Sequence, residues 1–412
     1  MTDEIIRGAG TPDAFTLCLN PLSGPDRPWT EAQNAILSDA GLSAARATIG
    51  AWPGYAPTPL VALPALAREI GVASLHYKDE GGRFGLGSFK ALGGAYAVAR
   101  LLQSELSRML GRAVAMDEVI GKAHPDEVSS ITVCCATDGN HGRSVAWGAQ
   151  TFGCSCVIFI HATVSEGRKE AIEAYGAEVR RCAGNYDDSV REAQETATRE
   201  GWFVVSDTSY PGYMDVPKDV MQGYEVMAAE AFEAIGTRPT HIFLQTGVGG
   251  MAAAVTALAV RRWGRERPRI VLCDPDKSAC WLVSIRAGEP TAVEGDLDTL
   301  MAGLACGEVS SLAWEILRDH ADAVMGLTDD SAVAAMRKLA RPEGGDPAIV
   351  AGESAVAGLA GLIAAMSDEE ARSALALDAD SRVLLFGTEG DTDRELYEKL
   401  VGMTGDAVRG KA

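Results

Sequence analysis

The 412-residue sequence lacks the features that mark secreted and membrane-spanning proteins. Its longest apolar stretches, residues 247–260 and 354–366, are rich in glycine and alanine and fall short of the roughly 20 residues that a bilayer-spanning helix needs. Its first residues carry no basic segment followed by an apolar core, which is the pattern of a signal peptide. These absences predict a cytoplasmic protein.

Positive charge is also scarce. The 37 Lys and Arg residues stand against 57 Asp and Glu residues, which gives a net charge of −20. A surface this acidic repels nucleic-acid phosphates and anionic lipids, so neither nucleic acid nor a membrane is an expected partner. A small anionic ligand would need a local basic or dipolar pocket.

Metal-binding patterns are absent from the nine cysteines and six histidines, which form no paired CxxC, HExxH or HxH motif. No metal site is therefore expected. The odd number of cysteines and their positions in apolar runs indicate buried free thiols. The sequence does not decide whether Cys280 and Cys306 form a disulfide.

Short apolar runs alternate with amphipathic stretches along most of the chain. The apolar runs predict strands at 74–77, 131–136, 156–160, 203–206, 241–245, 270–273 and 383–386. The amphipathic stretches predict helices at 91–103, 143–152, 165–175, 187–199, 218–235 and 251–263. Continuous apolar strands separated by helices are typical of parallel sheets covered on both faces. The sequence therefore predicts an α/β fold with two such sheets.

Two segments break this alternation. The first 50 or so residues show few periodic signals and are expected to wrap the surface, and the polar stretch 104–130 is expected to be an insertion. Open α/β sheets bind ligands at the carboxyl ends of their strands. The residues that follow each strand are therefore the candidates for a functional site.

A glycine-rich turn, Gly247-Val248-Gly249-Gly250-Met251, follows the predicted strand 241–245 and opens an alanine-rich helix. Successive backbone N–H groups and the helix dipole can converge there on an anion such as a phosphate. The turn matches neither the spaced dinucleotide fingerprint nor a P-loop. A tight turn with close helix–sheet packing is the alternative interpretation.

Lys90 stands where a second glycine-rich segment, residues 81–87, meets the helix predicted from Ala91. The positive end of the helix dipole and the apolar neighbours favour a neutral, nucleophilic amine. A solvated surface lysine is the alternative.

A third strand-to-helix turn, residues 137–142, follows the predicted strand 131–136 and reads Thr-Asp-Gly-Asn-His-Gly. Its exposed backbone donors suit a carboxylate. Helix capping by Asp138 or Asn140 is the alternative interpretation.

These three elements resemble, in this order, the fold-type II pyridoxal phosphate enzymes, the group of tryptophan synthase β and the serine/threonine dehydratases. Within that group the sequence is most similar to the diaminopropionate ammonia-lyases. The resemblance covers about residues 50–400 and is carried by segments 55–60, 83–86, 88–90, 136–143, 185–188, 206–208, 221–224, 301–308 and 388–393. It implies a tryptophan synthase β-like fold with a large cofactor-binding lobe, 1–128 and 213–412, and a small mobile lobe, 129–212.

The resemblance also implies how pyridoxal 5'-phosphate is bound. Lys90 would form the Schiff base, and Asn140 would hydrogen-bond the ring hydroxyl. Thr388, after the predicted strand 383–386, is the candidate partner of the pyridine nitrogen, and a hydroxyl there suits β-elimination better than transamination. The phosphate would be held by the backbone of Gly247, Val248, Gly249, Gly250 and Met251.

The substrate carboxylate would bind to the turn formed by Thr137, Asp138, Gly139 and His141. Here His141 is interpreted as a loop-shaping residue and not as a general base. A carboxylate at Asp138 suits a cationic β-ammonium leaving group better than a neutral hydroxyl. Asp207, after the predicted strand 203–206, corresponds to the second acid of the family, with a capping or supporting role as its alternative.

The expected reaction is α,β-elimination of 2,3-diaminopropionate to pyruvate and two ammonia. The Cα proton would be removed by Lys90 for one enantiomer and by Asp138 for the other. The alternative is a serine/threonine dehydratase-like lyase acting on a related β-substituted amino acid, and a binding protein without turnover is a third possibility. Relatives are commonly homodimers, so a homodimer is expected.

Overall fold

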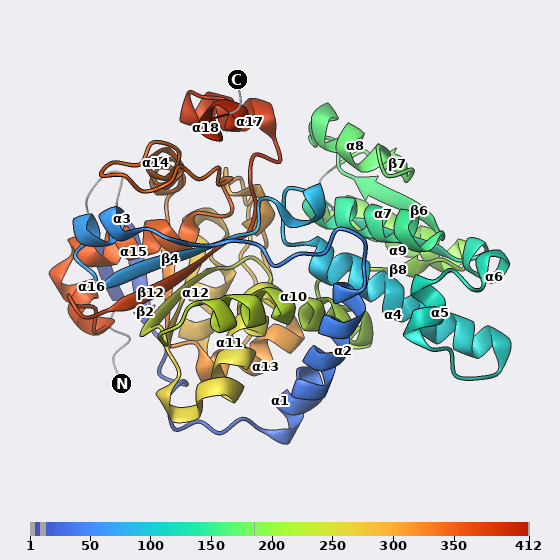
Figure 1. Cartoon of the computed structure of the whole chain (residues 1–412), viewed down its shortest axis with the longest axis horizontal. Coiled ribbons are helices and arrows are strands. Elements are labelled where there is room, and N and C mark those ends of the chain that lie inside the picture. Colours follow the sequence, from blue (N-terminus) through green and yellow to red (C-terminus); the bar gives the residue numbers. More distant parts are fainter. Residues whose placement is uncertain (1–4, 9–13, 138, 185, 411–412) are drawn as a thin grey trace. The chain divides into compact units, whose positions relative to one another are not determined.

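The computed structural model describes residues 5–8, 14–137, 139–184 and 186–410. The chain divides into two compact units (Figure 1). The large unit comprises Met1–Ile36, Pro57–Gly82 and Met227–Ala412, and the small unit comprises Leu37–Ala56 and Arg83–Val226. Residues 37–56 and 83–128, which were expected in the large lobe, thus belong to the small unit. That residues 129–212 form a mobile lobe stays a prediction.

The large unit is built on an eight-stranded sheet in the order β1-β2-β11-β10-β9-β12-β4-β3. The five strands from β11 to β4 are parallel to one another, whereas β1, β2 and β3 pair antiparallel at the two edges. The strands are β1 (Ile5–Gly8), β2 (Phe15–Leu19), β3 (Leu60–Ala62), β4 (Ser74–Asp79), β9 (His241–Gln245), β10 (Arg269–Pro275), β11 (Ala323–Leu327) and β12 (Arg382–Gly387). The predicted α/β fold with mainly parallel sheets is confirmed.

The core of the large unit lies along this sheet. Strands β9 and β11 are buried at all five positions, which explains the apolar sequence of β11 and of the three central residues of β9. Helix α15 packs against β9, β10 and β11. The helices of this unit are α1 (Glu31–Ile36), α3 (Pro64–Ile70), α11 (Gly250–Trp263), α12 (Cys280–Ala287), α13 (Ser311–His320), α14 (Asp329–Ala340), α15 (Ala357–Ser367), α16 (Glu369–Ala374), α17 (Arg394–Val401) and α18 (Gly405–Val408).

The expectation that the first 50 residues only wrap the surface is wrong for β2. This strand pairs with β11, and its Leu17 is fully buried in the core. The alternating burial of β2 needs a sheet neighbour about 300 residues away in the sequence, which the local pattern of a short segment does not reveal.

The small unit contains a four-stranded, fully parallel sheet in the order β7-β6-β5-β8. Cys134, Val157 and Phe159 pack with α9 on one face, while Ile158 lies beneath Gly142 of α7 on the other. The strands are β5 (Thr132–Ala136), β6 (Ser155–Ile160), β7 (Glu178–Arg181) and β8 (Phe203–Val204). The helices are α2 (Asp39–Gly50), α4 (Ala91–Leu110), α5 (Met116–Ile120), α6 (Pro125–Ser129), α7 (Asn140–Phe152), α8 (Glu166–Glu173) and α9 (Tyr186–Glu200), and α10 (Asp215–Ala234) continues into the large unit.

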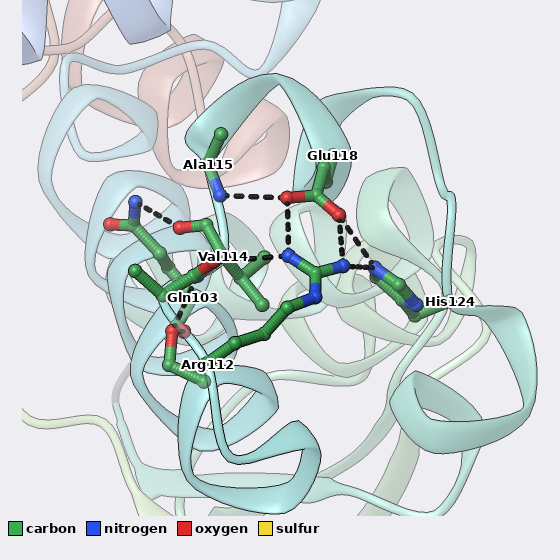
Figure 2. A network of polar contacts seen from close by, with 8 residues as sticks. Gln103, Arg112, Val114, Ala115, Glu118 and His124 are labelled. Atoms are coloured by element: carbon green, nitrogen blue, oxygen red, sulfur yellow. Dashed lines mark hydrogen bonds and ion pairs between the residues drawn. The ribbon is translucent and has the colours of Figure 1, made fainter.

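The stretch expected to be an insertion, 104–130, begins as the last turns of α4 and continues through α5 and α6. A polar network closes it (Figure 2). Arg112 donates to both carboxylate oxygens of Glu118 at 3.0 and 2.7 Å, and Glu118 also contacts His124 at 2.9 Å. Glu118 accepts a further bond from the backbone N–H of Ala115, which caps the start of α5. This network explains why a polar segment holds a defined conformation.

Within the part of the chain that the structure describes, no helix is both long enough and apolar enough to cross a membrane.

Candidate active site

Lys90 and Asp207 form the central contact of the small unit. Lys90 immediately precedes α4, at the helix start that the sequence predicts. Its Nζ lies 2.5 Å from Asp207 Oδ2, and the two side chains are 20 % and 16 % exposed. The interpretation of Lys90 as a solvated surface residue is therefore wrong. A carboxylate at this distance favours the ammonium form of the lysine, against the effect of the helix dipole.

His141 is the third member of this cluster. Its Nε2 donates to the carbonyl of Val205 at 2.8 Å, so in the neutral ring Nδ1 carries no proton. Nδ1 lies 3.8 Å from Asp207 Oδ2. Burial lowers the pKa of His141, which favours its neutral form. Burial would also raise the pKa of Asp207, but the charge and the hydrogen bond of Lys90 outweigh it and hold the pKa of Asp207 well below its usual range, and a protonated His141 would act in the same direction. Asp207 is thus an ionised carboxylate in a largely buried site.

Aromatic rings line the same lysine. The Nζ of Lys90 lies 5.5 Å from the ring centre of Phe89 and 5.8 Å from that of Tyr224, within the range of cation–π attraction. Tyr224 lies in α10 and is 1 % exposed. In the sequence Tyr224 stands out only as part of a family segment, because a tyrosine in a helix is indistinguishable from a core residue until the fold places it beside Lys90.

The turn between β5 and α7 is held by the hydroxyl of Thr137, which accepts hydrogen bonds from the N–H groups of Gly139 at 3.0 Å and Gly142 at 3.1 Å. A side chain at position 142 would collide with Thr137, since a Cβ there would lie 2.3 Å from its Cγ2. Asn140 is the first residue of α7 and Gly139 is its cap, so Asn140 does not cap the helix. Asp138 lies outside the described residues.

In the large unit, the glycine-rich turn connects β9 to α11 as expected. Gly249 caps α11 with a φ of 96°, a left-handed conformation that favours glycine. A Cβ on Gly249 would lie 2.3 Å from the ring of Trp281, and one on Gly247 would lie 3.0 Å from Cys306 Sγ. Close packing thus accounts for these two glycines, as the alternative interpretation of the turn requires.

The same turn also offers unused hydrogen-bond donors. The backbone N–H groups from Gly247 to Met251 donate to no other residue that the structure describes. The first N–H groups of a helix have no partner within the helix, and buried N–H groups in proteins are nearly always satisfied. A phosphate at the start of α11 would satisfy them, so these residues fit the phosphate of pyridoxal phosphate.

Thr388 directly follows β12 and is buried. Gln245, the last residue of β9, donates from Nε2 to the carbonyl of Phe386 and to Thr388 Oγ1, both at 2.7 Å. Because a carbonyl can only accept, this contact fixes the orientation of the Gln245 amide. Thr388 therefore accepts from Gln245 and keeps its own proton to donate to a ligand. The sequence analysis assigns no role to Gln245.

The nine cysteines are all free thiols, including Cys280 and Cys306. Cys280 is buried and its Sγ contacts the carbonyl of Gly247 at 3.5 Å. Burial raises the pKa of Cys280 well above the usual value, so this thiol stays protonated at neutral pH.

The candidate residues thus fall into two groups. Lys90, His141 and Asp207 come together in the small unit, together with the Thr137 turn, and the glycine-rich turn and Thr388 belong to the large unit. Each group lies where a parallel strand ends or a helix begins, which is where open α/β sheets bind their ligands. This fold and these residues define a fold-type II pyridoxal phosphate enzyme.

Comparison with known proteins agrees with this class. Residues 51–389 match the family described as pyridoxal-phosphate dependent enzyme, and the chain belongs to this family. A diaminopropionate ammonia-lyase of Escherichia coli (strain K12) is 42 % identical over 357 residues, which cover 84 % of this chain and 88 % of the relative.

Two solved structures of the Escherichia coli enzyme have the same fold. The holo form matches with a TM-score of 0.85 and 37 % identity, covering 96 % of this chain and 98 % of the other. The complex with an aminoacrylate-PLP azomethine reaction intermediate matches with a TM-score of 0.83 and 38 % identity, covering 94 % and 96 %.

Proposed function

We propose that this protein uses pyridoxal phosphate to eliminate ammonia from 2,3-diaminopropionate, giving pyruvate and two ammonia after hydrolysis. The observation that carries the proposal is the 42 % identity with a diaminopropionate ammonia-lyase over most of both chains. The ionised, largely buried carboxylate of Asp207 beside Lys90 agrees with a substrate that carries a second ammonium group.

Four groups of residues would hold the cofactor. Lys90 would bind it covalently, Asn140 would contact the ring hydroxyl, and the hydroxyl of Thr388 would donate to the pyridine nitrogen. The N–H groups of the glycine-rich turn, Gly247, Val248, Gly249, Gly250 and Met251, would bind the phosphate. When bound, the cofactor supplies the electron sink that makes the Cα–H bond of the amino acid acidic.

Lys90 and Asp207 would then divide the proton transfers. The Lys90 amine would take the Cα proton of one enantiomer. Asp207 is ionised and can pair with the β-ammonium of the substrate, which orients the group that leaves as ammonia. Asp138, outside the described residues, is proposed as the base for the other enantiomer and as a second partner of the β-ammonium.

The remaining residues would position the substrate. The backbone of Thr137, Asp138, Gly139 and His141 would receive its carboxylate. The Thr137 hydroxyl supports this role indirectly, because its two accepted hydrogen bonds fix the turn. His141 would shape the turn, since the hydrogen bond from its Nε2 to the carbonyl of Val205 fixes its ring, and its Nδ1 would hold Asp207 only when the ring is protonated.

The test is pyruvate release from L- and D-2,3-diaminopropionate, L-serine and L-threonine by the cofactor-loaded protein, with Lys90→Ala as the inactive control. The proposal predicts preference for diaminopropionate, abolished in the variant. Activity on both enantiomers would support a second base. Preference for serine or threonine would instead establish the dehydratase-like alternative on the same scaffold.

We further propose that the enzyme is cytoplasmic and a homodimer, and that residues 129–212 move as a small lobe during the reaction. The dimer rests on the family resemblance alone, and sedimentation at micromolar concentration tests it directly.

A further inference from the structure

Asp274 is a buried carboxylate that has no part in the proposed reaction. It lies near the end of β10 and is 0 % exposed. It accepts hydrogen bonds from the hydroxyl of Thr246 and from the backbone N–H groups of Trp281 at 2.9 Å and Leu282 at 3.1 Å. Thr246 directly precedes the glycine-rich turn, and Trp281 and Leu282 belong to the first turn of α12. Asp274 thus joins the entrance of the turn to a neighbouring helix.

Trp281 extends this connection to the turn itself. While its backbone donates to Asp274, its indole Nε1 donates to the carbonyl of Gly247 at 3.0 Å. Its ring also fills the space beside Gly249, where a Cβ would come within 2.3 Å of it. The indole therefore fixes one carbonyl of the turn and supports the cap of α11.

These contacts determine the direction of the free N–H groups. In a planar trans peptide the carbonyl and the N–H point in opposite directions. The bond from Trp281 to the carbonyl of Gly247 therefore turns the N–H of Val248 away from α12. In the same way, the carbonyl of Val248 accepts from the N–H of Ser310 at 2.9 Å, which turns the N–H of Gly249 away from Ser310.

We propose that Asp274, acting through Trp281, is a positioning residue that orients the N–H groups of the glycine-rich turn for the cofactor phosphate. This proposal deepens the proposed function, because it rests on the binding of pyridoxal phosphate by this turn. Burial raises the pKa of Asp274 to about 7, so an ionised carboxylate here is costly. Its three donors offset only part of that cost, because the pKa is raised even with these hydrogen bonds in place.

The test compares the variants Asp274→Asn and Trp281→Phe with a matched control, Asp346→Asn. Asp346 is also buried and also accepts from two backbone N–H groups at a helix start, those of Ala65 at 2.9 Å and Leu66 at 2.8 Å, but it does not contact the turn. Dissociation constants are measured for pyridoxal phosphate and for pyridoxal, which lacks the phosphate. Absorbance titration of the full chain freed of cofactor provides both values.

We expect Trp281→Phe to weaken pyridoxal phosphate binding about tenfold, which equals about 1.4 kcal/mol. Pyridoxal binding should change less than twofold, because only the phosphate uses the oriented N–H groups. Asp274→Asn should act in the same direction, since an amide cannot accept from all three donors. Asp346→Asn should change neither constant.

Two results would overturn the positioning role: unchanged phosphate affinity in Trp281→Phe, or equal losses for pyridoxal phosphate and pyridoxal, which would indicate a general disturbance of the fold. If Asp274→Asn does not fold, Trp281→Phe decides alone. The proposed function fails separately, because a wild-type chain that binds no pyridoxal phosphate or releases no pyruvate would refute it before any variant is compared.

Discussion

The contact between Asp207 and the β-ammonium of the substrate can be tested by Asp207→Asn. The substitution keeps the size of the side chain and removes its charge. In the structure the carboxylate holds a cation at 2.5 Å in a site where its own side chain is 16 % exposed. Removing one partner of such a hydrogen-bonded charge pair costs about 2–5 kcal/mol. If the substrate ammonium takes a similar position, kcat/KM for diaminopropionate should fall at least about 30-fold.

The informative quantity is the ratio of kcat/KM for diaminopropionate to kcat/KM for serine. Serine carries a neutral hydroxyl in place of the β-ammonium, so Asp207 contributes less to its binding, and the ratio should fall at least about tenfold. Steady-state assays of pyruvate release give both values. Asp219→Asn is the control, because Asp219 is a paired carboxylate of the small unit, 3.3 Å from Arg100, and lies outside the proposed site.

An equal loss for both substrates would refute the substrate contact. It would show that Asp207 acts through Lys90 or His141, which is the supporting role that the sequence leaves open. A variant with wild-type kinetics would remove Asp207 from the mechanism altogether.

Three further predictions follow from single contacts. Gly249→Ala should lower cofactor affinity in absorbance titrations, because its φ of 96° and the adjacent indole leave no room for a methyl group, whereas Gly236→Ala, at a positive φ with open space, should not. Thr388→Val should lower turnover, and unchanged turnover would contradict the proposed role of this hydroxyl. The same variant should lower the free energy of unfolding in urea by about 1–3 kcal/mol, because the amide of Gln245 loses its buried acceptor. Burial lowers the pKa of His320 to about 4, below the unfolded value near 6.5, so its stabilising contribution is complete above pH 6.5 and is lost as the pH falls. Between pH 6.5 and 5 the free energy of unfolding of the wild type should therefore fall by about 2 kcal/mol more than that of His320→Gln. An identical fall in both proteins would refute this.

Most strands that are buried on both faces were predictable from their apolar sequences, but β11 was missed although it is apolar and buried at all five positions. All seven predicted strands coincide with observed ones, and β9 has the predicted bounds, His241–Gln245. Strand β7 was missed because its sequence, Glu-Val-Arg-Arg, is mostly polar, and its pairing with β6 defines it as a strand. Strand β2 was missed for a related reason, because its hydrogen-bonded neighbour β11 is distant in the sequence.

The active-site residues could be recognised from the family motifs but not assembled from the local sequence. Lys90 and Asp207 are 117 residues apart, and no spacing rule predicts that their side chains meet. Asp274 and Gln245 could have been identified as candidates from the sequence. Each is a polar residue at the carboxyl end of an apolar strand, where open α/β sheets place their ligands. That rule locates such residues, but their hydrogen-bond partners on other elements decide what they do.

Phosphate binding by the glycine-rich turn, as proposed, would explain how so acidic a chain can recognise a phosphate. The sequence calls for a local basic or dipolar pocket, and the described structure provides the dipolar kind: backbone N–H groups at the start of α11. A dipole attracts an anion only if it points at it, whereas a lysine or arginine can attract one from many directions. Phosphate binding at the proposed site would therefore depend on what fixes the peptide planes, namely the hydrogen bonds of Trp281 and Ser310 to the carbonyls of the turn. For this reason a buried, uninvolved carboxylate such as Asp274 can matter to cofactor affinity without touching the cofactor.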